Sequence, residues 1–209
     1  MKKSTIMWLL GAGASVDSDL PTYRGPDGLY TEAEASQAMI SPEKQREILN
    51  KINHCRSGPT YEEIKKISSS ESFIITQNID GFAINTGLKT IEIHKRENND
   101  IVLLGEQLPK KKIHDTYRLI KQTSIDYVII MGTSMQFPYL RIFIDKAKSK
   151  GARIIHINPD KEYKGHLREK IKIMSDEVYS SHKKAKNEIV LYMNCLDGLA
   201  HFTNHICNK

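Results

Sequence analysis

The sequence predicts an α/β fold, a doubly wound parallel sheet with a small helical module beside it. Short apolar runs rich in β-branched residues recur along the chain, and each one ends in a small or polar turn before a helical stretch. This order of strand, turn and helix occurs four times, which is typical of units with right-handed crossovers. At 209 residues the chain can bury one main core, so we expect a single domain over residues 1–209.

The first apolar run is Ile6–Leu10, and a glycine-rich loop follows it. The run has no polar residue, as expected for a strand buried on both faces of a sheet. The loop reads Gly11-Ala12-Gly13-Ala14-Ser15, and glycines after such a strand let the backbone approach a phosphate. The dinucleotide fingerprint has a third glycine and an acidic residue roughly 20 positions later, and neither is present, so a plain turn is the alternative. Tyr23 and Arg24 come next, and an aromatic face beside a fixed cation suits an anionic ligand that contains a ring.

A polar helical segment follows, and the chain then returns to the sheet. Residues 29–59 include a helix start at Ser41-Pro42-Glu43, so we expect the small helical module there. Residues 60–67 begin with threonine and carry glutamate three positions later, a capping box that predicts a second helix. The run Phe73–Thr76 predicts the next buried strand, and its carboxyl end carries Gln77, Asn78 and Asp80. Open parallel sheets bind ligands at that edge, although asparagine and aspartate also favour simple turns.

A short strand over residues 90–93 brings His94 to the same edge. A histidine there suits proton transfer near neutral pH, and a structural role is the alternative. The strand over residues 127–131 ends in Gly132-Thr133-Ser134, whose amides and hydroxyls suit a phosphate. The remaining expected elements are helices over about residues 111–123 and 139–150, strands over 152–157 and 188–193, and a final helix from residue 197.

Charge and cysteine content exclude several classes of protein. The net charge is +6, and scattered lysines supply much of it, which fits a solvated surface better than a nucleic-acid site. Cys55, Cys195 and Cys207 are too few and too far apart for a disulfide framework or a metal site, which indicates a reducing compartment. The first apolar run is short and ends at a glycine loop, so we expect no signal peptide, no membrane span, and a cytoplasmic or nuclear protein.

Taken in order, these motifs resemble those of the sirtuins, the family of NAD-dependent protein deacylases. The resemblance covers nearly the whole chain, and the set is specific although each motif is unremarkable singly. The matching segments are GAGAS (11–15), PTYRG (21–25), TQNID (76–80), His94, Leu104-Gly105-Glu106 with Pro109, GTS (132–134) and INPD (157–160).

The resemblance implies a Rossmann-like sheet that binds NAD, and a role for each matched residue. It implies that His94 is the general base and that Asn78 orients the ribose and a water molecule. The residues implied to bind NAD are Gly11, Ala12, Gly13, Ala14, Ser15, Tyr23, Arg24, Gln77, Asn78, Ile79, Asp80, Gly132, Thr133, Ser134, Asn158 and Cys195. The residues implied to hold an acyl-lysine peptide, added as a strand, are Val102, Leu104, Gly105 and Glu106.

The implied reaction removes an acyl group from a protein lysine and releases nicotinamide and O-acyl-ADP-ribose. The histidine takes a proton from a ribose hydroxyl, which is ordinary general-base catalysis. Two alternatives remain open. One is NAD hydrolysis or ADP-ribosyl transfer, in which water or another nucleophile meets the same ribosyl cation, and the other is a non-catalytic module that binds NAD or ADP-ribose.

The chain departs from the family pattern where sirtuins carry a zinc ribbon. Nine residues separate His94 from Leu104, and none of them is a cysteine, so we expect no zinc ribbon and no bound metal. Leu104 replaces the family's phenylalanine, and Lys95 replaces a glycine. Succinyl-preferring sirtuins carry a Tyr-x-x-Arg pair, and the best match here, Leu49-Asn50-Lys51-Ile52, lacks both partners. We therefore expect neutral acyl groups, acetyl or longer, in preference to succinyl, because an unpaired buried carboxylate is costly.

Overall fold

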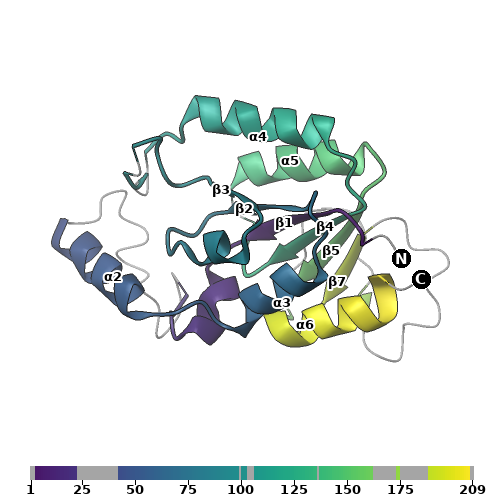
Figure 1. The fold of residues 1–209 in the computed structure, drawn as a ribbon, viewed down its shortest axis with the longest axis horizontal. Helices are drawn as coiled ribbons and strands as arrows, with labels where there is room; N and C mark the ends of the chain where they lie inside the picture. The colour runs from purple at the N-terminus through teal and green to yellow at the C-terminus, as the bar shows by residue number, and fades with distance from the viewer. Residues whose placement is uncertain are drawn as a thin grey trace.

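A parallel sheet forms the centre of the computed structural model, which describes residues 3–22, 42–98, 100–102, 106–135, 137–161, 173–174 and 188–207 (Figure 1). The seven strands lie in the order β3-β2-β1-β4-β5-β7-β6, and every neighbouring pair is parallel. The strands are β1 (Ile6–Leu10), β2 (Phe73–Thr76), β3 (Lys89–Glu92), β4 (Tyr127–Met131), β5 (Arg153–Ile157), β6 (Ile173–Met174) and β7 (Glu188–Leu191). The predicted doubly wound, Rossmann-like fold is confirmed.

The strand order reverses between β1 and β4. From β1 the chain winds outward to β2 and β3, and after β4 it winds outward in the opposite direction to β5. In open α/β sheets a ligand binds beyond the carboxyl ends of the strands at this reversal. Leu10 pairs in register with both Thr76 and Met131, so the three strands β1, β2 and β4 end level with one another. The residues that follow them therefore meet at one edge.

Helices cover both faces of the sheet because the central strands are apolar throughout. Figure 1 shows α4 (Lys110–Gln122) and α5 (Pro138–Lys148) on one face, and α3 (Pro59–Ile67) and α6 (Cys195–His201) on the other. Alternate residues of β1 enter the two cores: Trp8 packs in the cluster that contains Ile64 and Leu199, and Leu9 packs in the cluster that contains Phe143. All of these side chains are buried, and their burial is the main stabilising contribution.

The other helical elements of the described residues are α2 (Pro42–His54), which confirms the helix start at Pro42, and three shorter turns. These turns are the 3-10 helices η1 (Ala12–Ser18) and η2 (Phe82–Thr86) and the π-helical turn η4 (Phe202–Cys207). The last helix begins two residues before the expected position, because Asn194 caps it by accepting the Asp197 N–H at 2.9 Å. Within the described part of the chain, no helix is both long enough and apolar enough to cross a membrane.

The capping box predicted at the start of α3 is wrong. The helix begins at Pro59 after Gly58, and no side chain of the N-cap residue bonds to it. Proline is favoured at the first helical position, so the start lies before Thr60. Asp17 of η1 accepts the Thr60 N–H at 2.8 Å and supplies the cap from another part of the chain.

Residues 94–98 and 100–102 form a tight hairpin that follows β3 and leads toward α4. Its hydrogen bonds run from Val102 N–H to His94 O (2.8 Å) and from Arg96 N–H to Asp100 O (2.7 Å), around an antiparallel bridge between Lys95 and Ile101. Lys95 also pairs with Glu92 at 2.7 Å. From α4, the Lys112 ammonium donates to the carbonyls of Glu92 and Lys95. The hairpin is therefore held against both β3 and α4.

Candidate active site

The loops after β1 and β4 touch backbone against backbone. Gly13 N–H donates to Gly132 O at 2.9 Å, and Gly11 N–H donates to the last carbonyl of β4 at 2.9 Å. A Cβ atom on Gly132 would lie 2.2 Å from Ala14 N, and the φ angle of Gly132 is +64°, so a side chain there would be both strained and blocked. The two loops predicted to hold phosphate thus lie side by side at the reversal of strand order.

Four side chains form a first hydrogen-bond network beneath the glycine loop, which we call the Tyr61 network: Ser15, Tyr61, Asn78 and Asp80. The Ser15 hydroxyl donates to Asp80 Oδ2 at 2.7 Å and lies 2.7 Å from the Tyr61 hydroxyl. Asn78 Nδ2 donates to Gly11 O at 3.1 Å, to Ser15 Oγ at 3.1 Å and to Tyr61 at 3.3 Å. Since the one hydroxyl proton of Ser15 goes to Asp80, the Tyr61 hydroxyl is the donor to Ser15.

Burial sets the protonation of this network. It raises the pKa of the Tyr61 hydroxyl, and the charge of Asp80 adds to that shift, so the tyrosine stays protonated and can donate. Burial also raises the pKa of the Asp80 carboxyl, while the hydrogen bonds from Ser15 and from the Phe82 N–H oppose the rise. The carboxylate is therefore held by two donors in a site of low polarity.

One acceptor in the Tyr61 network has no partner. Asn78 is 2% exposed, and its buried Oδ1 has no hydrogen-bond partner among the described residues. An unsatisfied buried acceptor costs about 1–3 kcal/mol, so such atoms are rare in native proteins. A ligand hydroxyl beside the glycine loop would supply the missing donor.

A second network lies on the α5 side of the same strand end, and we call it the Tyr139 network: Gln77, His94, Thr133 and Tyr139. Thr133 Oγ1 donates to Gln77 Oε1 at 2.7 Å, and Gln77 Nε2 donates to the Tyr139 hydroxyl at 3.1 Å. That hydroxyl lies 3.1 Å from His94 Nε2. Burial lowers the pKa of His94, and a backbone hydrogen bond to Gln77 opposes the shift, so the ring is neutral near pH 7. A neutral imidazole is a base.

The sequence predicted most of these residues but missed Tyr61 and Tyr139. Tyr61 lies one turn before Ile64 and is 1% exposed, so its spacing resembles that of any core residue. Tyr139 follows Pro138 in the first turn of α5 and is half-buried. A single sequence carries no signal that separates a buried tyrosine hydroxyl in a network from an ordinary packed ring.

The remaining predicted nucleotide residues lie around the same edge, with two exceptions. Cys195 Sγ donates to Gly13 O at 3.5 Å, and burial, with a smaller contribution from the Asp17 charge, raises the pKa of this thiol to about 12. Asn158 follows β5 and is half-buried, Ala12 and Ile79 are half-buried, and Ser134 is exposed. Tyr23 and Arg24 lie outside the described residues.

The predicted peptide-binding residues are described only in part. Leu104 and Gly105 lie outside the described residues, and Glu106 pairs with Arg96 at 2.8 Å. The Val102 N–H donates to the His94 carbonyl, so an added strand would have to use the Val102 carbonyl instead. In α2, Lys51 points to solvent and pairs with Glu47 at 3.1 Å, and Ile52 is buried in the core.

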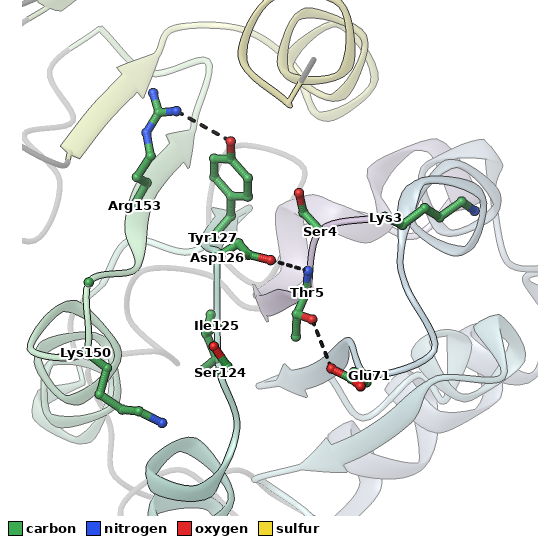
Figure 2. A pocket seen from close by; sticks show the side chains of 11 residues that line it. Lys3, Ser4, Thr5, Glu71, Ser124, Ile125, Asp126, Tyr127, Lys150 and Arg153 are labelled. Atoms are coloured by element: carbon green, nitrogen blue, oxygen red, sulfur yellow. Dashed lines mark hydrogen bonds between the residues drawn. The ribbon is translucent and has the colours of Figure 1, made fainter. Parts of the chain in front are cut away.

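A hollow of about 560 Å³ lies at the opposite, amino edge of the sheet, and its charged groups already have structural partners (Figure 2). Asp126 accepts the Thr5 N–H at 2.8 Å, and the Arg153 guanidinium lies 5.5 Å from the Tyr127 ring centre. Lys150 donates to three carbonyls at the end of α4. No group of three or more metal-ligating side chains is found among the described residues, here or elsewhere.

Known proteins similar to this chain share one activity in their names. No protein-family model matches the chain. The NAD-dependent protein deacylase 2 of Pseudomonas aeruginosa is 26% identical, over 74% of this chain and 81% of that protein. The NAD-dependent protein deacetylase of Listeria monocytogenes is 26% identical, over 76% of this chain and 86% of that protein.

Solved structures of Sir2 homologues share the fold of this chain. A Sir2 homologue in complex with 2′-O-acetyl ADP ribose matches with a TM-score of 0.68 at 19% identity, covering 98% of this chain and 92% of that one. A Sir2 homologue in complex with NAD matches with a TM-score of 0.63 at 18% identity, covering 97% and 89%. The chain has the Sir2 fold, and the proteins that resemble it in sequence are NAD-dependent protein deacylases and deacetylases, so the resemblance to the sirtuins is confirmed.

Proposed function

We propose that the chain is an NAD-dependent protein lysine deacylase. The observation that carries this proposal is the meeting, at one edge of the sheet, of a glycine cradle, a buried asparagine with a spare acceptor, and a neutral histidine. Gly132, Asn78 and His94 supply these three features. The names of the relatives, which include NAD-dependent deacylases and complexes with NAD and ADP ribose, support the same activity.

The residues at this edge fit NAD. The backbone of residues 11–15 and 132–134 suits the pyrophosphate, because the glycines allow close approach of a charged group. The unpartnered Oδ1 of Asn78 is satisfied when a ribose hydroxyl donates to it. Asp80, held by Ser15, is an acceptor for the amide of the nicotinamide. When bound, NAD supplies an electrophilic ribose carbon whose leaving group is nicotinamide.

His94 acts as the general base in this proposal. Its neutral ring accepts a proton from a ribose hydroxyl, which the low pKa of the buried imidazole permits near pH 7. The burial of Gln77, Asn78 and Thr133, each at most 7% exposed, keeps bulk water from this side of the site. The dry surroundings strengthen each hydrogen bond that the side chains make to the reacting groups.

We also propose that the chain is a single catalytic domain without a zinc ribbon. The hairpin of residues 94–98 and 100–102, held by the Glu92–Lys95 pair and by Lys112, supplies the connection for which other sirtuins use the ribbon. Purified protein should contain no stoichiometric zinc, and a chelator should leave its unfolding temperature unchanged. Stoichiometric zinc, or unfolding by the chelator, would contradict this part of the proposal.

NAD hydrolysis or ADP-ribosyl transfer is the second candidate function, because the short hairpin leaves less protein to hold a peptide. One experiment separates the candidates: incubation with NAD, with and without an acetyl-lysine peptide, followed by measurement of nicotinamide. Release that depends on the peptide supports deacylation. Release without the peptide supports hydrolysis, and binding of NAD without any release identifies a non-catalytic module.

Among deacylase substrates we propose a preference for acetyl or longer neutral acyl groups. The surface pairing of Lys51 with Glu47 supports this, since that ammonium is already engaged away from the core. Matched acetyl, myristoyl and succinyl peptides test the preference. A preference for succinyl that is lost in Lys51→Ala would overturn it and identify lysine as the carboxylate partner.

A further inference from the structure

The Tyr139 hydroxyl lies between two polar residues that follow β2 and β3, Gln77 and His94. It accepts from Gln77 Nε2 at 3.1 Å and lies 3.1 Å from His94 Nε2. The ring of Tyr139 is fixed by neighbouring aromatic residues: its centre lies 5.7 Å from that of Phe137 and 6.0 Å from that of Phe143. A ring packed against two aromatic neighbours places its hydroxyl with little freedom.

The direction of each proton in the Tyr139 network follows from the donor inventory. Thr133 donates to the carbonyl oxygen of the Gln77 side chain, so the amide nitrogen faces Tyr139 and donates to it. The hydroxyl of Tyr139 then has its own proton left to donate, and His94 Nε2 is the acceptor within reach. An Nε2 that accepts this proton carries none of its own, so the single proton of the neutral ring is on Nδ1.

We propose that Tyr139 is a positioning residue for His94: its hydroxyl holds the imidazole in the Nδ1–H form and keeps Nε2 as the basic nitrogen. The inference rests on the proposed function in assigning His94 the role of base. The network links the base to Thr133, so the loop after β4 that faces the nucleotide also fixes the tautomer of the histidine. A ribose hydroxyl that gives its proton to His94 must take the place of the Tyr139 hydroxyl at Nε2, and the wrong tautomer would present it with an N–H in place of a lone pair.

The first test is spectroscopic and does not depend on turnover. Protein labelled with ¹⁵N-histidine gives the tautomer of each ring from its nitrogen shifts, and His94→Ala identifies the signals of His94. In the unaltered protein at pH 8, we expect a protonated Nδ1 and an unprotonated Nε2. In Tyr139→Phe, we expect both nitrogens to move toward intermediate shifts, because the tautomers now exchange.

The second test is kinetic. Tyr139→Phe keeps the packed ring and removes the hydroxyl, so kcat for nicotinamide release should fall about 10- to 100-fold, less than the loss of the base itself would cause. The dissociation constant for NAD should change by less than about twofold, because a positioning role does not remove a binding contact. Tyr117→Phe, which removes a hydroxyl from an exposed ring of α4, is the matched control.

A protonated Nε2 in the unaltered protein overturns the inference without any substitution. So does a Tyr139→Phe variant whose His94 shifts or whose kcat match those of the Tyr117→Phe control. If the unaltered protein shows the expected tautomer but releases no nicotinamide under any condition, the proposed function fails while the assignment of the proton stands.

Discussion

The Tyr61 and Tyr139 networks contain the consecutive residues Asn78 and Gln77, and yet they differ in burial and in the group that each one offers to a ligand. The Tyr61 network ties together η1, α3 and the end of β2, and its central side chains are at most 2% exposed. The Tyr139 network ends at a half-buried ring and a neutral base. The Tyr61 network leaves one acceptor, Asn78 Oδ1, without a partner in the part of the chain that the structure describes.

This difference indicates that the two networks have different roles. The Tyr61 network, whose central side chains are buried, stabilises the fold. Its unpaired acceptor is suited to a ligand hydroxyl, because binding removes the cost of leaving that acceptor unsatisfied. The Tyr139 network, which ends at the half-buried ring of His94, controls a proton instead. Substitutions in the Tyr61 network should therefore change stability and the affinity for NAD, and substitutions in the Tyr139 network should change turnover.

The largest effect is expected for the base of the Tyr139 network. His94→Ala should lower the rate of nicotinamide release by about 10²- to 10⁴-fold, because general-base catalysis is lost. The affinity for NAD, measured by calorimetry, should change little. His114→Ala on the exposed surface of α4 is the control, and a His94→Ala enzyme with undiminished turnover would refute the assignment of the base.

The centre of the Tyr61 network should show the opposite pattern. Asn78→Ala removes the donor to Gly11 O, Ser15 and Tyr61, so the free energy of unfolding should fall by about 1–3 kcal/mol. The dissociation constant for NAD should rise as well, because the spare acceptor is gone. Urea unfolding and calorimetry measure the two effects. Unchanged stability together with unchanged affinity would show that the Tyr61 network contributes neither to the fold nor to the binding of NAD.

The two tyrosines give the sharpest comparison. Tyr61→Phe retains the contact of the ring with Phe82, at 5.9 Å between centres, and removes a buried donor, so stability should fall by about 0.5–1.5 kcal/mol with kcat nearly unchanged. Tyr139→Phe should cost less stability, since its ring is only half-buried, and should lower kcat more, since its hydroxyl contacts the base. Equal effects of the two substitutions on both quantities would erase the distinction between the networks.

The smallest predicted effect is the position of the acidic limb of the pH profile. His94 must be neutral to act as a base, and burial lowers its pKa below 6.5. Activity should therefore persist as the pH falls past 6.5 and be lost only as it falls through the lower pKa of the folded state. Nicotinamide release at saturating NAD between pH 5 and 8 provides the measurement, and a midpoint above 6.5 would contradict the shift.

The sequence was sufficient to predict the side chains at the edge of the sheet and every described strand except β6. Short runs rich in β-branched residues, such as Phe73–Thr76, favour buried strands, and parallel pairing places the polar residues after them at the carboxyl edge. What the sequence could not supply was partners distant along the chain. The cap of α3 comes from Asp17 and not from Thr60, and the hydroxyl beside His94 comes from α5, 45 positions later. Such pairings depend on tertiary packing, which local patterns do not encode.

The contact between the two glycine loops also has a consequence for how the chain acquires its site. Gly13 and Gly132 are brought together only when β1 and β4 have paired, and Gln77 reaches Thr133 only when β2 has joined them. Closing such long loops is slow compared with forming a helix, because the entropy is lost before the contacts are gained. A chain with its helices and single strands formed would thus still lack the nucleotide cradle. The capacity to bind should appear late, together with completion of the central strand pairing, and not in gradual steps.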